Sequence, residues 1–183
     1  MMFRTPQTIL HRRRAFTLIE TAMATVIVGV GIFGTMALFA ACSNQNNESG
    51  QMTVGIMLAD NVQEAMANLP FNDPVWGRAT FGAETGETVT TWNDIDDFDG
   101  KTINPPIDSL RTPLTGMSQY QQVVTVVPVY PGQLSSNTND ASPAIPKTTY
   151  TGAARVRVRI MYRPVTTLPW QEVYRYSWIR LDR

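Results

Sequence analysis

An uncharged apolar run near the amino terminus constrains this chain more than any other feature. From Thr21 to Cys42 the sequence reads TAMATVIVGVGIFGTMALFAAC, 22 residues without a charged side chain. A helix rises about 1.5 Å per residue, so this run is long enough to cross a bilayer core of about 30 Å. We therefore expect a membrane-spanning helix rather than the core helix of a soluble protein.

Basic residues stand directly before this run and predict its orientation. Arg12, Arg13 and Arg14 precede the apolar segment, and positive residues beside a span remain on the cytoplasmic side. The sequence therefore predicts a single-pass protein with a cytoplasmic amino terminus and an exported carboxyl-terminal region.

The remaining charges and the reactive residues exclude several functions. Residues 43–140 carry three basic and twelve acidic residues, whereas residues 141–183 carry eight basic and two acidic ones. Because the acidic middle would repel phosphate, no nucleic-acid partner is expected. The chain has one cysteine and one histidine, His11, which are too few for a His-ligated metal site and make a catalytic triad improbable. We expect no catalytic residues, and a periplasmic enzyme would have to depend on carboxylates.

One acid, Glu20, lies at the start of the apolar segment. A lone carboxylate in a membrane costs several kcal/mol unless it finds a partner. Cleavage after Ala15 would create a suitable partner, because it would free an α-amino group on Phe16.

Residues 14–20, which read RAFTLIE, resemble the cleavage and methylation signature of type IV prepilins and type II secretion pseudopilins. The resemblance implies that residues 1–15 are a basic leader, removed after Ala15 by a prepilin peptidase. It also implies that Phe16 becomes an N-methylated terminus and that Glu20 pairs with the amino group of a neighbouring subunit. The chain departs from the family in one place, because Ala15 stands where glycine is usual.

The same resemblance implies a function, a location and partners. The chain would be a structural subunit, minor-pilin-like over residues 58–66, held in a bacterial inner membrane and assembled into a pilus or pseudopilus. Its partners would be the prepilin peptidase, other pilins or pseudopilins, and an inner-membrane assembly platform. Secretion, adhesion, motility and DNA uptake all remain open as the purpose of the filament.

A second motif gives an alternative. Residues 38–43, LFAACS, resemble a bacterial lipobox in which Cys42 would be lipidated. The chain would then be an exported lipoprotein, or a signal-anchored binding domain, that does not polymerise. The apolar run exceeds the usual signal-peptide core of about 7–15 residues, which favours Cys42 as a small apolar side chain instead.

Three glycines, Gly29, Gly31 and Gly34, weaken the apolar helix. The pilin resemblance implies that the helix can extend here on assembly, and close helix packing is the alternative.

Beyond the membrane segment, the periodicity predicts a helix followed by a sheet. Apolar residues spaced by three and four indicate an amphipathic helix over residues 43–70: Met52, Ile56, Ala59, Val62, Met66 and Leu69. Residues 120–130, 154–162 and 172–181 read as strands, and apolar residues on both faces favour a central position for the last. We expect an α+β, pilin-like fold, in which a long amino-terminal helix (16–42 and 43–70) packs on a small antiparallel sheet within residues 71–183.

Four carboxylates lie close together in the loop region: Asp94, Asp96, Asp97 and Asp99. Oxygen ligands in a turn suit a hard cation, so Ca²⁺ is a candidate ligand, and no other cofactor is expected. The spacing does not fit an EF-hand, and a solvated acidic turn is the alternative.

Three arginines alternate with apolar residues in the second predicted strand. Arg155, Arg157 and Arg159 therefore share one face, and their mutual repulsion favours an acidic partner. This partner would be either the chain's own acidic middle or a neighbouring subunit.

Overall fold

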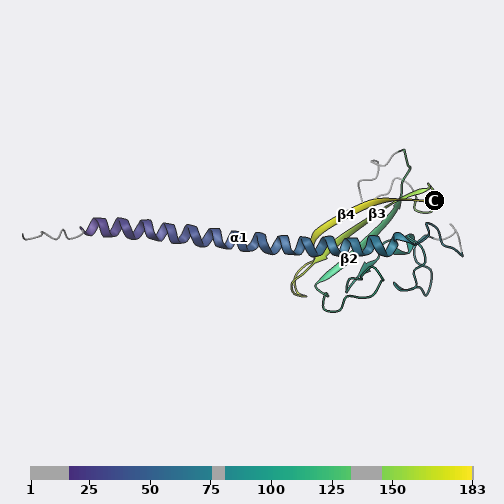
Figure 1. Cartoon of the computed structure of the whole chain (residues 1–183), viewed down its shortest axis with the longest axis horizontal. Coiled ribbons are helices and arrows are strands. Elements are labelled where there is room, and N and C mark those ends of the chain that lie inside the picture. Colours follow the sequence, from purple (N-terminus) through teal and green to yellow (C-terminus); the bar gives the residue numbers. More distant parts are fainter. Residues whose placement is uncertain (1–16, 76–80, 133–145, 183) are drawn as a thin grey trace, which may run out of the picture. The chain divides into compact units, whose positions relative to one another are not determined.

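The computed structural model describes residues 17–75, 81–132 and 146–182 (Figure 1). The predicted cleavage site at Ala15 and Phe16, and the leader arginines Arg12, Arg13 and Arg14, lie outside the described residues. The elements are α1 (Leu18–Ala67), the 3₁₀ helix η1 (Asp96–Phe98), β1 (Thr102–Ile103), β2 (Tyr120–Pro128), β3 (Ala153–Tyr162) and β4 (Gln171–Leu181). The chain divides into two compact units, Met1–Asn46 and Asn47–Arg183.

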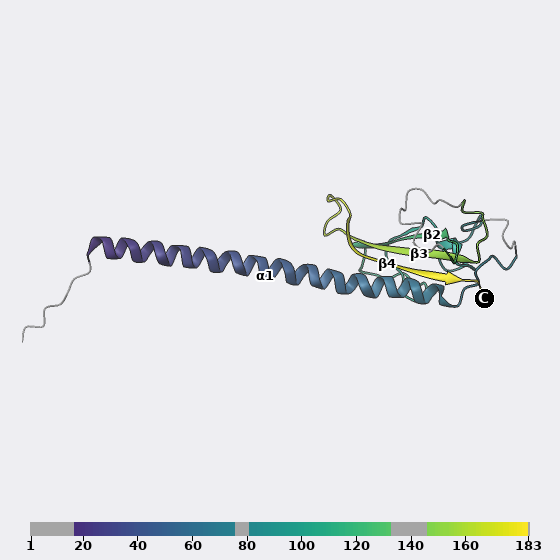
Figure 2. The ribbon, with the colours of Figure 1, turned by 90° about the horizontal axis from the view of Figure 1, so that it is seen from above.

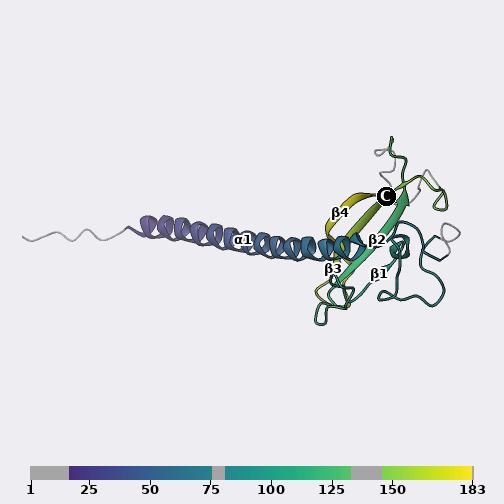
Figure 3. The same ribbon diagram turned by 45° about the vertical axis from the view of Figure 1, so that its right-hand side comes forward.

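In the second unit, four antiparallel strands form one sheet in the order β1-β2-β3-β4 (Figure 3). Val158 of β3 lies opposite Val124 of β2 and Tyr176 of β4, so these side chains share one face. The run of β-branched residues in β2 and the alternation of arginine with apolar residues in β3 favour this arrangement, because alternate side chains point to opposite faces of a strand. The three predicted strands are therefore confirmed, with bounds within two residues of those expected.

The last turns of α1 cover one face of the sheet and form the core of this unit with it (Figure 2). Leu58, Ala59 and Val62 are completely buried against residues of β2 and β3, and Met66 is nearly so. This pairing of one long amino-terminal helix with an antiparallel sheet confirms the predicted α+β layout.

The buried face of the helix differs from the predicted one at its amino-terminal end. Met52 and Ile56 are 50% and 38% exposed, whereas Gly55 and Leu58 are buried. Gly55 accounts for the difference, because a Cβ atom there would lie only 2.7 Å from Cβ of Tyr174. The helix therefore meets β4 at a residue without a side chain, more closely than a Cβ atom would allow, and this favours the side of the helix that carries Gly55 as the buried one.

The prediction that the last strand is central was wrong. β4 pairs only with β3 among the described strands and forms an edge of the sheet. Its two apolar faces have separate causes. Tyr176 and Trp178 pack toward the helix, and Ile179 on the other side packs against a small cluster that includes Val127. An edge strand can thus carry apolar residues on both faces when each face has a local cover.

A buried glutamine joins the helix, the sheet and the loop that follows β1. Gln122 is fully buried, and its Nε2 donates to the carbonyl oxygens of Leu58, at 2.9 Å, and Ile107, at 3.1 Å. Its Oε1 accepts from the Ile107 backbone N–H at 2.8 Å. Since buried amides are costly unless paired, these three bonds hold the layers in register.

Candidate functional site

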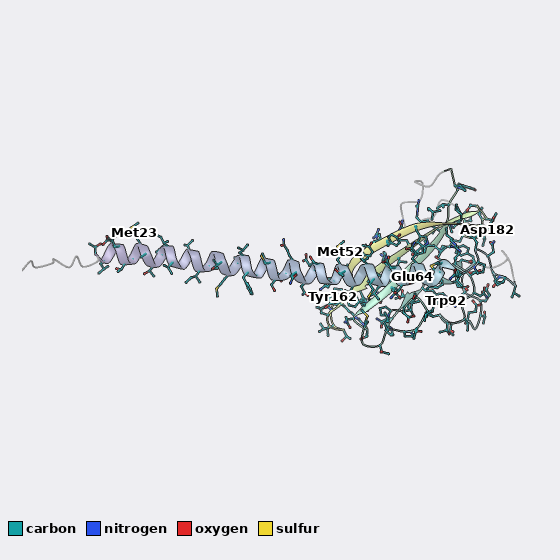
Figure 4. All side chains as sticks on the ribbon, viewed as in Figure 1. Met23, Met52, Glu64, Trp92, Tyr162 and Asp182 are labelled. Atoms are coloured by element: carbon teal, nitrogen blue, oxygen red, sulfur yellow. The ribbon has the colours of Figure 1, made fainter. Side chains whose placement is uncertain are left out.

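The first unit presents an apolar helix that the described residues leave uncovered. Residues 17–46 are all exposed, including Phe33 and Phe39, and Met23 projects freely from the helix (Figure 4). By length and composition α1 could span a membrane, and its most apolar stretch has no buried residue. A helix that is apolar all round is stable only inside a membrane or among other helices, so this surface requires lipid or protein around it.

Threonine hydroxyls in this segment are satisfied within the helix. The hydroxyl of Thr21 donates to the Leu18 carbonyl at 2.9 Å, and that of Thr25 donates to the Thr21 carbonyl at 2.8 Å. Thr35 bonds in the same manner to the Ile32 carbonyl at 2.8 Å. Such bonds to the preceding turn satisfy these three threonine hydroxyls without water, which suits apolar surroundings.

Glu20 forms a capping box with Thr17 at the start of α1. The Thr17 backbone N–H and hydroxyl both donate to Glu20 Oε2 at 2.9 Å, and the Glu20 N–H donates to Thr17 Oγ1 at 3.3 Å. Thr17 immediately precedes the first helical residue, so these bonds satisfy backbone groups that a helix start leaves open. The carboxylate also lies at the positive end of the helix dipole.

The small residues of this helix do not pack on the rest of the described chain. A Cβ atom added at Gly29, Gly31 or Gly34 would meet nothing within 4 Å. Cys42 is exposed and lies inside α1, which continues to Ala67. These positions are therefore open to contacts with lipid or with other helices.

The alternative prediction of a solvated acidic turn was wrong, because most of its carboxylates are buried. Asp94, Asp96 and Asp97 are 2%, 8% and 1% exposed. Their oxygens cap backbone groups around η1: Asp94 Oδ1 accepts from the N–H groups of Asp96, at 3.0 Å, and Asp97, at 3.2 Å. Asp96 Oδ2 accepts from the Gly82 N–H at 2.8 Å. Backbone donors thus replace water around these side chains.

Burial changes how these acids titrate. It raises the pKa of Asp94 to about 8, and the neighbouring carboxylates of Asp96 and Asp97 add to the effect. Burial likewise raises the pKa of Asp96. Asp99 differs, because its Oδ1 accepts from the Val126 N–H at 2.9 Å and its Oδ2 forms an ion pair with Lys147. The predicted metal ligands therefore do not act as one group: Asp94 and Asp96 accept from backbone N–H groups around η1, whereas Asp99 pairs with β2 and Lys147.

Asp97 is brought together with two acids that sequence reasoning did not select. Glu84, Glu87 and Asp97 each place a carboxylate oxygen within 4.8 Å of the others. Burial raises the pKa of Glu87, and the nearby charges of Asp97 and Glu84 add to this rise. The Glu-x-x-Glu spacing was visible in the sequence, but its approach to Asp97 depends on the path of the loop.

The arginine row lies on the face of the sheet that points away from α1. Arg159 of β3 is directly opposite Arg175 of β4. Glu172 lies beside both, with Oε1 at 2.9 Å from Arg175 Nε and Oε2 at 3.8 Å from Arg159 Nη1. Among the described residues, the acid beside this arginine pair therefore comes from β4.

The described residues thus offer two sites of interest: an acid at the start of an exposed apolar helix, and a buried acidic loop. No protein-family model, curated protein or solved structure matches the chain.

Proposed function

We propose that this chain is a non-enzymatic structural subunit of a filament, a minor pilin or pseudopilin of the type IV pilus or type II secretion kind. It is cleaved after Ala15 by a prepilin peptidase, methylated on Phe16 and held in a bacterial inner membrane until an assembly platform extracts it. The observation that carries the proposal is the uncovered apolar part of α1, residues 17–46, whose one acid, Glu20, occupies the first turn of the helix.

Assembly needs a polar contact, because an apolar helix gains little free energy when its lipid neighbours are replaced by other apolar helices. Lipid tails are as apolar as leucine, so the transfer from membrane to filament core does not by itself fix the position of a subunit. Pairing of Glu20 with the amino group on Phe16 of a neighbour neutralises two charges and sets the axial register. The bonds from Thr17 end on Oε2, which leaves Oε1 of Glu20 for that contact.

Two substitutions separate the charge of Glu20 from its capping role. Glu20→Gln keeps an oxygen that Thr17 can donate to but removes the negative charge. Thr17→Val removes the hydroxyl of the cap and keeps the charge, so it is the matched control. We expect both variants to insert into membranes at the wild-type level, and only Glu20→Gln to disappear from the filaments.

The measurement is the amount of each variant in sheared filaments relative to the membrane fraction, in cells that hold the chain's own assembly machinery. Wild-type incorporation of Glu20→Gln would contradict the register role. The intact mass of the membrane-derived protein provides an independent check. A terminus at N-methyl-Phe16 supports the proposal, whereas a diacylated Cys42 terminus would overturn it in favour of the lipoprotein.

A further inference from the structure

Three carboxylates converge in the segment between α1 and β1. Glu84, Glu87 and Asp97 place oxygens within 4.8 Å of one another. The two glutamates are partly buried, and Asp97 is 1% exposed. Three negative charges at this distance repel one another, and burial strengthens that repulsion because it reduces screening by water.

Asp97 has one oxygen that no hydrogen bond uses. Its Oδ2 accepts from the N–H groups of Asn93, at 2.7 Å, and Asp94, at 3.2 Å. Its Oδ1 is buried and has no hydrogen-bond partner among the described residues. A buried carboxylate oxygen without a donor is costly, and a cation within the cluster would remove that cost.

Asn93 supplies a further oxygen to the same neighbourhood. Its Nδ2 donates to Glu87 Oε1 at 2.9 Å, which attaches the side chain to the cluster. Its Oδ1 is buried and accepts no hydrogen bond from the described residues. The segment therefore contains two buried, unpaired oxygens as well as the two glutamate side chains.

We propose that Glu84, Glu87 and Asp97, together with the amide oxygen of Asn93, form a binding site for a hard divalent cation, best matched by Ca²⁺. The donors are all oxygen, and carboxylate and amide oxygens are the ligands that calcium takes in flexible loops. Nitrogen or sulfur ligands, which zinc prefers, are not part of the cluster. Of the four aspartates predicted from the sequence, only Asp97 belongs to this site.

A cation here would join two stretches of loop. Glu84 and Glu87 precede a turn in which the Trp92 N–H donates to the Thr88 carbonyl at 2.9 Å, and Asn93 and Asp97 follow it. The second stretch continues into Phe98, which packs against Trp92 with ring centroids 4.5 Å apart. Binding therefore stabilises the loop that packs under the sheet, and it does so whether or not the chain forms a filament.

Terbium luminescence tests the site directly on the full chain in detergent, after metal is removed with EDTA. Trp92 is adjacent in sequence to Asn93, so a bound Tb³⁺ should emit when tryptophan is excited. We expect Ca²⁺ to displace this signal. Ca²⁺ at about a hundred times its dissociation constant should also raise the melting temperature by about 5–10 °C.

Substitutions identify the ligands. We expect Glu87→Gln and Asp97→Asn each to weaken Ca²⁺ binding about tenfold or more, since affinity follows the charge of the ligands. Asp108→Asn is the matched control, because Asp108 Oδ1 caps a separate turn through the N–H groups of Leu110 and Thr112. It should bind Ca²⁺ as the wild type does.

If Asp97→Asn does not fold, Glu87→Gln and Glu84→Gln test the site instead. Both glutamates are only partly buried, so their substitution should leave the fold intact. Absence of a Ca²⁺-reversible signal in the wild type would overturn the proposal. Wild-type affinity in both glutamate variants, or an equal loss in Asp108→Asn, would overturn it as well.

Discussion

Gly55 lies where α1 approaches β4 more closely than a side chain would allow. A Cβ atom at this position would lie 2.7 Å from Cβ of Tyr174 and 3.6 Å from Cγ2 of Val173. The Cβ of Tyr174 is attached to the backbone of the strand, so a change of rotamer cannot move it away. Gly55→Ala should therefore push the helix away from the sheet and destabilise the unit.

The size of the effect follows from two opposing contributions. Forcing an extra carbon into a packed contact costs about 1–3 kcal/mol, whereas alanine in place of glycine stabilises a helix by about 1 kcal/mol. Gly50→Ala provides the matched control, since a Cβ atom there would meet nothing within 4 Å. The control gains only the helical contribution. The free energy of unfolding of Gly55→Ala should thus be about 1–3 kcal/mol lower than that of Gly50→Ala.

Thermal unfolding of the full chain in detergent measures this difference. Trp178 packs against the core, so its fluorescence reports the loss of helix and sheet contacts. Each kcal/mol shifts the melting temperature of a chain of this size by about 2–4 °C, which makes the two variants distinguishable. Equal melting temperatures would refute the close approach at Gly55, and with it our account of which helix face is buried.

Three further predictions concern buried or paired polar groups. Gln122→Leu should lower the free energy of unfolding by about 2–3 kcal/mol in denaturant titrations, because it leaves the buried Ile107 N–H without an acceptor. Burial raises the pKa of Asp94 from 3.8 to about 8, so the folded state binds an extra proton between these values and stability falls as the pH rises from 3.8 toward 8. Asp94→Asn should flatten this slope in melting curves recorded with EDTA, and an unchanged slope would count against the buried acid. Glu172→Gln should cost less than about 1 kcal/mol, and the loss should shrink in high salt, since the arginine pair it bridges is partly exposed.

The sequence predicted the strands well and the docking of the helix less well. Alternation along a strand is a local property, so the bounds of β2, β3 and β4 could be read from β-branched and arginine positions. The side of a helix that becomes buried depends also on the shape of its partner. Met52 fits the apolar period, yet it stays exposed because the contact is centred on Gly55, a residue that contributes no apolar side chain.

The polar sites also depend on tertiary structure that local sequence patterns do not predict. A cluster of aspartates indicates negative charge. Its spacing does not reveal that Asp94 and Asp96 will be buried and will accept hydrogen bonds from backbone N–H groups. Glu84 and Glu87 join Asp97 only through the path of the loop. The Thr17-x-x-Glu20 pattern can be seen in the sequence, but it can be identified as a capping box only once the helix is known to begin at Leu18.

The order of the chain has a consequence during synthesis. The helical half of the core, which ends near Met66, is made before any strand of its sheet, and β4 is completed only at Leu181. At typical rates of translation the wait lasts on the order of ten seconds, during which Leu58 and Val62 have no native partner. Throughout that interval the nascent chain exposes an amphipathic helix surface whose apolar side has nothing native to pack against.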